Sequence, residues 1–142
     1  MALNLKLSNA TADVQGDATA PLFNNGYQRV YSGAQPTTSD TAIGAQVLLA
    51  EARFAAVGIA TSVNGLLTAN PLVAGSKVLV TGLATWFRNF RSDGVTVIND
   101  GAVGSTATGD EASLPADCVI SNRNLQQNAD YNVTSFTHTV TK

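Results

Sequence analysis

The chain has 142 residues, of which 44% are apolar and only 13% are charged, and its formal net charge is −2. This length suits one domain with a real hydrophobic core. The slight negative charge argues against a dedicated nucleic-acid binder, because such proteins carry a basic excess. With so few charges, little repulsion keeps copies of the chain apart, which suits a protein that works within an assembly.

The first predicted element is a short helix from Asn9 to Val14, with Ser8 as its N-cap. The segment from Tyr27 to Tyr31 is rich in strand-forming residues and predicts a strand. The segment from Val47 to Phe54 alternates with a period of two residues, which also predicts a strand. The alanine-rich sequence from Thr41 to Arg53 suits a helix by propensity, so both readings stay open there.

The middle of the chain contains a hairpin signal and a long apolar segment. Asn64-Gly65 is a strong two-residue turn signal between two strand-like segments. The segment from Lys77 to Phe90 reads as one long strand, with Trp86 and Phe87 on opposite faces. Apolar groups on both faces predict a strand buried within a two-layer body.

The last third of the chain is punctuated by turn signals. Asp93-Gly94 and Asn99-Asp100-Gly101 predict two turns, because Gly supplies positive φ and Asp tolerates it. A polar loop, a short strand, a polar crossing and a last strand follow, over Gly104–Ala112, Cys118–Ile120, Asn122–Asp130 and Tyr131–Val140. Turns at intervals of about 8 to 12 residues are typical of a sandwich or barrel.

These patterns predict an all-β fold: a single jelly-roll-like β-sandwich domain over residues 1–142, with a short N-terminal helical segment. The two ends, residues 1–8 and 138–142, are expected to form extended arms that could add a strand to a neighbouring molecule.

No segment predicts a membrane anchor or export. The stretch from Phe54 to Ser76 lacks charged residues and is long enough to cross a bilayer, but its Thr, Asn, Gly and Pro residues interrupt any apolar helix surface. We interpret it as strands and a turn. Residues Met1–Lys6 lack the basic start and apolar run of a signal peptide, and Cys118 is the one cysteine. Both observations fit synthesis in a reducing cytoplasm.

The sequence offers little for catalysis or metal binding. His138 is the only histidine, and with Cys118 it is one of two soft metal ligands. No serine lies in a Gly-x-Ser-x-Gly elbow, and no glycine pattern matches a phosphate loop. Cys118 reads as a small core residue. We therefore expect no enzymatic activity, no metal and no cofactor.

The densest chemical cluster is Trp86-Phe87-Arg88-Asn89-Phe90-Arg91. Aromatic and arginine side chains in this pattern could stack on nucleic acid and neutralise it. A second reading makes Trp86 a core anchor, with the arginines along a strand edge or paired with Asp93 and Asp100. A third treats the cluster as a protein interface, where aromatic residues and Arg are enriched. On this third reading the interface residues are Phe87, Arg88, Phe90 and Arg91.

Several segments resemble one family, in the family's order. They are Arg29–Pro36, Ala45–Glu51, Gly82–Arg88, Ser92–Gly94, Asp100–Gly104 and Val133–Thr137. Together they are similar to small structural proteins of tailed bacteriophages, decoration-like or cement-like proteins associated with the head. The resemblance implies a place in the virion, on the capsid surface, after synthesis in the bacterial host cytoplasm. It implies no catalytic residues.

The leading functional hypothesis is a capsid decoration or cement protein that binds across major capsid subunits and stabilises the DNA-filled head. Its expected partners are the major capsid protein and further copies of itself, as a dimer or trimer, without direct contact to nucleic acid or membrane. One alternative is a neck or tail connector or fibre-associated virion protein. Another is a carbohydrate- or host-binding β-sandwich, in which Trp86, Tyr27 and Tyr31 would stack on sugars.

Overall fold

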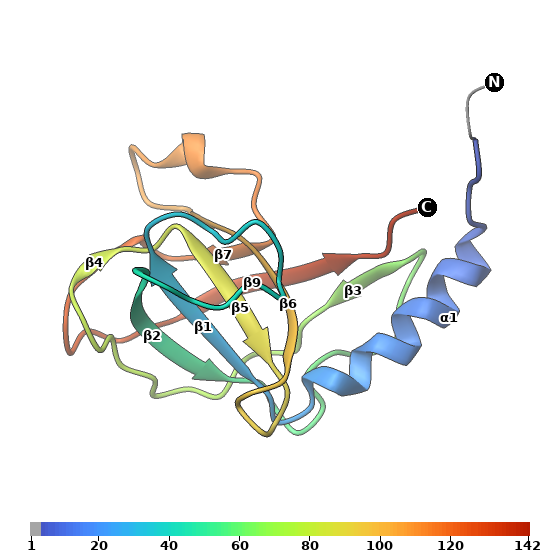
Figure 1. Cartoon of the computed structure of the whole chain (residues 1–142), viewed down its shortest axis with the longest axis horizontal. Helices are drawn as coiled ribbons and strands as arrows, with labels where there is room; N and C mark the ends of the chain where they lie inside the picture. Colours follow the sequence, from blue (N-terminus) through green and yellow to red (C-terminus); the bar gives the residue numbers. More distant parts are fainter. Residues whose placement is uncertain (1–3) are drawn as a thin grey trace.

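The computed structural model describes residues 4–142 and shows a mostly β protein with one large mixed sheet and a short N-terminal helix (Figure 1). The strands are β1 (Tyr27–Ser32), β2 (Val47–Arg53), β3 (Leu66–Thr68), β4 (Gly82–Leu83), β5 (Trp86–Phe90), β6 (Val97–Ser105), β7 (Cys118–Ile120), β8 (Asn124–Leu125) and β9 (Val133–Thr139). The helices are α1 (Asn9–Thr19) and two 3-10 turns, η1 (Ala20–Phe23) and η2 (Glu111–Ser113). The prediction of a β-rich chain with an N-terminal helix is confirmed at this level.

The large sheet has seven strands in the order β2-β1-β5-β6-β7-β9-β3, and β4 pairs with β8 in a separate two-stranded sheet. Within the large sheet β6 and β7 run parallel, and the other neighbours run antiparallel. Strands from opposite ends of the sheet line the same core, because Phe54 directly follows β2 and its ring lies 5.9 Å from that of Phe136 in β9. The sheet therefore curls around its core, and among the described residues it does not close into a barrel.

The helix α1 begins at the predicted cap: the Ser8 hydroxyl accepts a hydrogen bond from the backbone N–H of Thr11 at 3.2 Å. It continues past the predicted end at Val14, through Gly16, because that glycine is buried against the chain near Ser62. A Cβ at Gly16 would lie 2.6 Å from the Ser62 hydroxyl oxygen. Helix propensity alone does not anticipate a glycine that is kept for close packing.

Two predicted turns are confirmed in detail. Asn64 and Gly65 both have positive φ, 53° and 79°, as a two-residue hairpin turn between Val63 and Leu66 requires. At Asp93-Gly94 the Asp93 carboxylate accepts hydrogen bonds from the backbone N–H groups of Val95 and Thr96, each at 2.8 Å. In both cases the local chemistry of the turn decides the structure.

The predicted long strand from Lys77 to Phe90 is wrong. Its first part runs along the free edge of β2, where the Leu79 N–H donates to the Leu49 carbonyl at 2.7 Å. Its middle forms β4 and pairs with β8, and only its last five residues form β5. Alternating side chains indicated extended backbone correctly, but they carry no information about which partner strand each part meets.

The predicted turn at Asn99-Asp100-Gly101 is also wrong, because all three residues lie inside β6. Each has a tertiary role there. Asp100 pairs with Arg88, Asn99 accepts a hydrogen bond from Asn89 at 2.8 Å, and Gly101 leaves room for the Phe87 ring. A Cβ at Gly101 would lie 3.0 Å from that ring, so the residues that resemble a turn are selected by packing across strands.

The core is built around four phenylalanine rings. Phe136 in β9 lies edge-on to Phe87 at 5.4 Å between ring centroids, and within 6 Å of both Phe23 and Phe54. All four side chains are buried. Aromatic pairs at such distances and angles add stabilisation beyond their buried area.

The two predicted arms have different outcomes. In the first, residues 1–3 lie outside the described residues, and 4–7 have no regular secondary structure. In the second, the structure places His138 and Thr139 in β9, paired with Leu67 and Leu66 of β3. The Val140 N–H then donates to the Gly65 carbonyl at 2.8 Å. The C-terminal segment is therefore attached to the sheet as far as Val140, because β3 provides a partner strand.

The uncharged stretch from Phe54 to Ser76 contains β3 and the Asn64-Gly65 turn, as its interpretation as strands and a turn required. Across residues 4–142, no helix has the length and apolar character that crossing a membrane demands.

We predict that Phe136→Ala lowers the free energy of unfolding by about 3–5 kcal/mol, because it removes the ring that joins the other three. Urea unfolding followed by circular dichroism measures the loss. The neighbouring exposed residue provides the control: Ser135→Ala should stay within about 0.5 kcal/mol. Equal effects of the two changes would contradict this description of the core.

Candidate interaction surface

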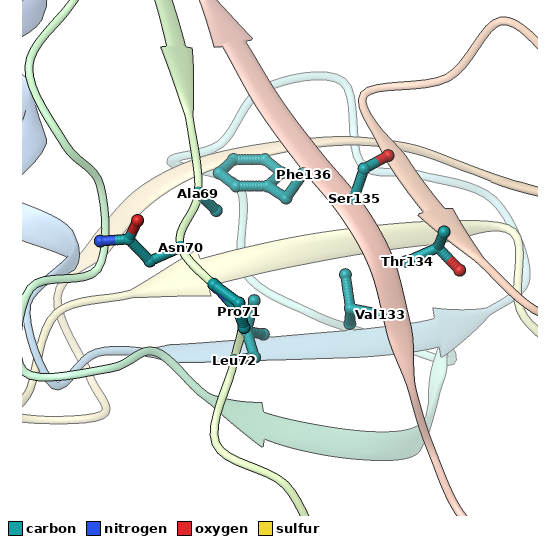
Figure 2. A pocket seen from close by; sticks show the side chains of 8 residues that line it. All are labelled: Ala69, Asn70, Pro71, Leu72, Val133, Thr134, Ser135 and Phe136. Atoms are coloured by element: carbon teal, nitrogen blue, oxygen red, sulfur yellow. The ribbon is translucent and has the colours of Figure 1, made fainter.

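A shallow pocket lies beside β9, where the chain after β3 leaves the sheet (Figure 2). The Ala69 N–H still donates to the Phe136 carbonyl, but the Asn70 N–H turns to Gly58, and Pro71 has no N–H to donate. The resulting gap has a volume of about 130 Å³. Its lining contains no charged side chain: Ala69, Asn70, Pro71, Leu72, Val133, Thr134, Ser135 and Phe136. Such a lining offers no acid, base or metal ligand.

The most organised chemistry lies on the outer face of β2, β1, β5 and β6, opposite the core. Directly opposed residues on neighbouring strands point to the same face of a sheet. The register therefore places arginines, aromatic rings and carboxylates in three rows, which we call the outer-face ladder. The rows are Arg53–Tyr27–Phe90, Glu51–Arg29–Arg88–Asp100 and Tyr31–Trp86.

The middle row of the ladder places two arginines between two carboxylates. Arg29 and Arg88 stand opposite each other, and each has a carboxylate on its outer side. The Arg29 Nε donates to Glu51 at 2.5 Å, and the Arg88 Nη2 donates to Asp100 at 2.8 Å. The guanidiniums also contact rings of the adjacent rows: Arg29 lies 4.5 Å from the Phe90 ring centroid, and Arg88 lies 5.4 Å from that of Trp86. Cation–π contacts and ion pairs thus connect the three rows.

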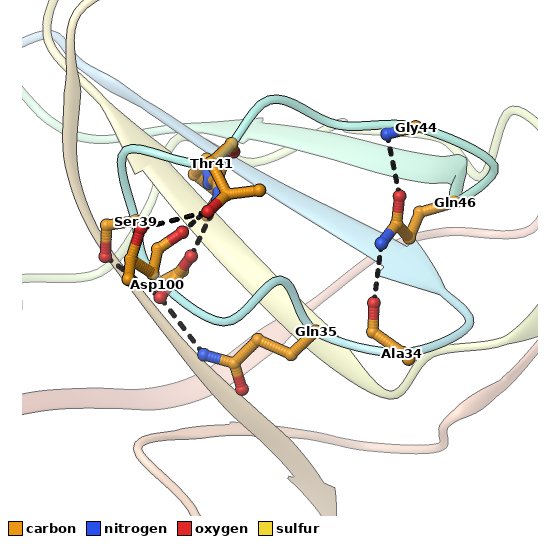
Figure 3. Close-up of polar contacts among 9 residues, drawn as sticks. Ala34, Gln35, Ser39, Thr41, Gly44, Gln46 and Asp100 are labelled. Carbon is orange, nitrogen blue, oxygen red and sulfur yellow. Dashed lines mark hydrogen bonds and ion pairs between the residues drawn. The ribbon is translucent and has the colours of Figure 1, made fainter.

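A strap, residues 33–46, covers one half of this ladder (Figure 3). It connects β1 to β2, and its backbone carbonyls at Thr38 and Thr41 accept hydrogen bonds from Arg88. Gln35 and Ser39 each donate to Asp100 at 3.0 Å. These bonds satisfy most of the polar atoms of an ion pair whose two side chains are only 3% and 6% exposed. A buried ion pair needs such extra hydrogen bonds to offset the loss of its hydration.

The strap also holds its own shape. The Gln46 side chain donates to the Ala34 carbonyl at 2.7 Å and accepts from the Gly44 N–H at 2.8 Å (Figure 3). At the start of the strap, the hydroxyl of Thr85, which lies between β4 and β5, donates to the Gly33 carbonyl at 2.6 Å. The strap is therefore fixed to the sheet at both ends as well as at the ion pair.

The other half of the ladder is open. Arg53 is exposed, and its guanidinium lies 5.4 Å from the centroid of the half-buried Tyr27 ring. Arg29 lies 5.8 Å from the same centroid. The β1–β2 register places Tyr27 directly opposite Arg53, so the position of both residues is set by the sheet and not by a loop.

The four residues predicted as an interface have different positions. Phe87 lies in the core, while Arg88 and Phe90 lie in the ladder with 3% and 6% exposure. Arg91 follows β5 and is exposed. These four residues are neighbours in the sequence but do not form one surface, because alternate side chains face opposite sides of β5. Of the four, Arg91 is accessible to a partner of the folded subunit.

Burial also bears on the two other readings of this cluster. Trp86 is 1% exposed and stacks on Tyr31 at 4.5 Å between ring centroids. The hypotheses of sugar stacking and nucleic-acid stacking both need exposed rings, and here these two rings contact each other instead. The second reading is right that Arg88 pairs with Asp100, but it is wrong that Trp86 anchors the core, because Trp86 is buried on the opposite face of the sheet.

His138 and Cys118, the two soft ligands of the sequence, have separate partners. The His138 Nδ1 lies 3.2 Å from the Asn99 side-chain nitrogen, and burial lowers the pKa of the imidazole. The Cys118 Sγ lies 3.4 Å from the Gln28 side-chain oxygen, and burial raises the pKa of the thiol to about 12. Cys118 is fully buried, as expected of a small core residue. Within residues 4–142, no three His, Cys, Asp or Glu side chains gather as a metal site.

The chain before β4 runs along β2 (Figure 1). Several apolar side chains are exposed in this region. The N–H groups of Leu79 and Val80 both point to the Leu49 carbonyl, and Gly82 lies against the Leu49 side chain. Four large apolar residues at this edge are 43–49% exposed: Val47, Leu79, Val80 and Leu83. We call this group the β2 rim. Grouped exposed apolar residues of this kind mark contact surfaces for other proteins.

Comparison of the chain with protein-family models, curated proteins and solved structures gave no match. The site is therefore interpreted from its own geometry and from the sequence resemblance.

Sequence reasoning singled out the arginines and aromatic residues of the ladder and offered Asp100 as an arginine partner, although its turn prediction left Asp100 outside any strand. It also offered Asp93, which instead accepts hydrogen bonds within its own turn, and it missed Glu51 as the partner of Arg29. One signal was present: the resemblance segments contain Arg29, Tyr31, Trp86 and Asp100, and the structure gathers them in one ladder. The sequence does not reveal that these segments lie side by side, because their proximity depends on the order of the strands in the sheet.

We predict that Arg88→Met lowers the free energy of unfolding by about 3–5 kcal/mol, because it leaves the buried Asp100 carboxylate unpaired. The double variant Arg88→Met/Asp100→Leu should lose less than the single variant, since no buried charge remains. Urea unfolding of Arg88→Met, Asp100→Leu and the double variant measures the three values. A double variant that loses the sum of the two single effects would show that the pair is not coupled.

The Cys118 thiol is predicted to be unreactive in the folded protein, because it is buried and its pKa is raised to about 12. Ellman's reagent at pH 8 should leave it unmodified in buffer and titrate it fully in urea. Rapid modification of the native protein, at the rate seen in urea, would contradict this assignment.

Proposed function

We propose that this protein is a structural component of the virion of a tailed bacteriophage, a capsid decoration or cement protein that binds across major capsid subunits. The observation that carries the proposal is that five of the six resemblance segments meet at the strapped ladder, whereas the sixth, Val133–Thr137, lies in β9. Residues that a family would retain for a common fold and surface are expected to meet in space.

The physical character of the subunit supports a binding role. The buried ion pair between Arg88 and Asp100 and its hydrogen bonds attach the strap to the sheet, so these polar groups have a structural role. The β2 rim adds an exposed apolar edge beside that frame. A standard protein interface buries roughly 1,600 Å² in total, which requires rigid surfaces of this kind over several strands.

We extend the proposal to the finer fold. Strands from both ends of the large sheet line one core, with Ala50 of β2 and Leu67 of β3 in the same cluster. A curled sheet around one core supports the jelly-roll-like β-sandwich that the turn spacing predicts. In this arrangement the open end of the ladder and the β2 rim are exposed and could contact capsid subunits and further copies of the chain, as a dimer or trimer.

The mechanism is additive binding. Each copy would bridge neighbouring shell subunits, so that separation of the subunits under the pressure of packaged DNA would break its contacts as well. Self-association would raise the effective concentration of a second contact once the first has formed. Many weak contacts then resist expansion of the head together.

We predict that heads assembled without this protein burst at a lower temperature than complete heads, and that adding the purified protein restores the difference. Release of DNA on heating, followed with an intercalating dye, measures the transition. The same amount of heat-denatured protein serves as a control for the addition. Unchanged bursting temperature would contradict the cement role.

Counting copies per particle by quantitative mass spectrometry separates the two virion roles. A shell protein should approach the copy number of the major capsid protein. A neck or tail protein should be present only in the small number of a single ring, and that result would replace the decoration assignment with the connector assignment.

A further inference from the structure

We propose that Arg53 and Tyr27 form a docking point for a carboxylate carried by an acidic segment of a protein partner. Identifying that partner as a capsid subunit rests on the proposed function. The docking point itself follows from the charges and contacts of the outer-face ladder.

The ladder contains one guanidinium more than it has carboxylates. Arg88 pairs with Asp100, and Arg29 pairs with Glu51. Arg53 has no ion pair or side-chain hydrogen bond within residues 4–142, although it occupies the same face. The ladder is therefore one negative charge short, and the uncompensated position is at its exposed end.

Arg53 is held in place without a charged partner. Its guanidinium lies over the Tyr27 ring, and Arg29 lies near the same ring. Arg29 is itself fixed, because its Nε donates to Glu51 and its Nη1 donates to the Gly94 carbonyl at 3.0 Å. A cation positioned in this way loses less conformational freedom when it binds an anion.

The nearest turn provides no carboxylate for Arg53. Gly94 lies against the site, and a Cβ there would be 3.4 Å from the Arg29 Nη2 and 3.7 Å from the Tyr27 ring. Its neighbour Asp93 is occupied within the turn, where it accepts from the Val95 and Thr96 N–H groups and the Thr96 hydroxyl. The turn therefore packs a glycine against Arg29 and Tyr27, and the Asp93 carboxylate is not available to Arg53.

These features select the chemistry of the ligand. A guanidinium presents parallel N–H donors that match a carboxylate, and Tyr and Arg are the residues most enriched at energetically important interface positions. Nucleic acid needs a stripe of positive charge along its backbone, and this chain has a net charge of −2 with one uncompensated guanidinium in the ladder. A protein segment bearing Asp or Glu is therefore the favoured occupant.

The test uses the full-length protein and a hexaglutamate peptide at low ionic strength, with binding followed by NMR titration. The Arg53→Gln variant should bind the peptide about tenfold more weakly than the wild type, and Arg53→Glu should show no binding. Arg53→Lys keeps the charge but loses the paired donors, so its affinity should fall between those of the wild type and Arg53→Gln.

Arg91→Gln is the matched control, because Arg91 is also exposed and has no ion pair within the described chain, yet it makes no recorded ring contact. It should change the affinity by less than about twofold. Equal weakening by Arg91→Gln and Arg53→Gln would show that net charge alone drives binding and would overturn the proposal. So would tighter binding of an oligothymidylate than of hexaglutamate, which would indicate a phosphate surface.

A second measurement separates this inference from the proposed function. If wild-type protein binds isolated heads and Arg53→Gln binds them equally well, the docking point is wrong and the decoration role stands. If wild-type protein ignores heads but binds hexaglutamate through Arg53, the decoration role is wrong and the docking point stands. Thermal unfolding of Arg53→Gln should match that of the wild type, because the side chain is exposed and has no ion pair to lose.

Discussion

The buried ion pair between Arg88 and Asp100 is the interaction on which the outer half of this structure depends. Two charges removed from water are costly unless nearly all their hydrogen-bonding capacity is satisfied. Here the strap satisfies most of it, with the carbonyls of Thr38 and Thr41 on the guanidinium and the side chains of Gln35 and Ser39 on the carboxylate. The buried Arg88 Nε has no partner among the described residues. The strap is ordered by the ion pair, and the ion pair is tolerated because of the strap.

The same register that creates this pair also builds the core. A strand shows alternate side chains to opposite faces, so β5 sends Trp86, Arg88 and Phe90 outward and Phe87 into the phenylalanine cluster. A slip of one residue would place the guanidinium in the core and the Phe87 ring on the ladder. Core packing and outer-face electrostatics therefore favour the same register of β1, β5 and β6. A shifted register would disrupt both the phenylalanine cluster and the ion pair.

The division of the ladder into a covered and an open half gives the surface its functional interpretation. In the covered half, Arg88 is paired with Asp100 and Tyr31 stacks on Trp86, so these residues stabilise the fold. At the open end, Arg53 lies over Tyr27 with no carboxylate of its own, and the β2 rim exposes apolar side chains along the edge beside β4. A rigid frame with an unpaired cation and an apolar edge is suited to contact with another protein, which is the basis of the proposed place on the capsid.

The sequence by itself determined the local features: the Ser8 cap, the Asn64-Gly65 and Asp93-Gly94 turns, the extended character of most segments, and the burial of Cys118. Each depends on neighbouring residues or on side-chain type. Only the tertiary structure decided that Lys77 to Phe90 divides among three partners, and that Asn99-Asp100-Gly101 belongs to a strand. It also decided that Arg88 is internal while Arg53 is open. Strand order and register depend on contacts between residues far apart in the chain, and a local alternation pattern is the same whichever strand lies next to it.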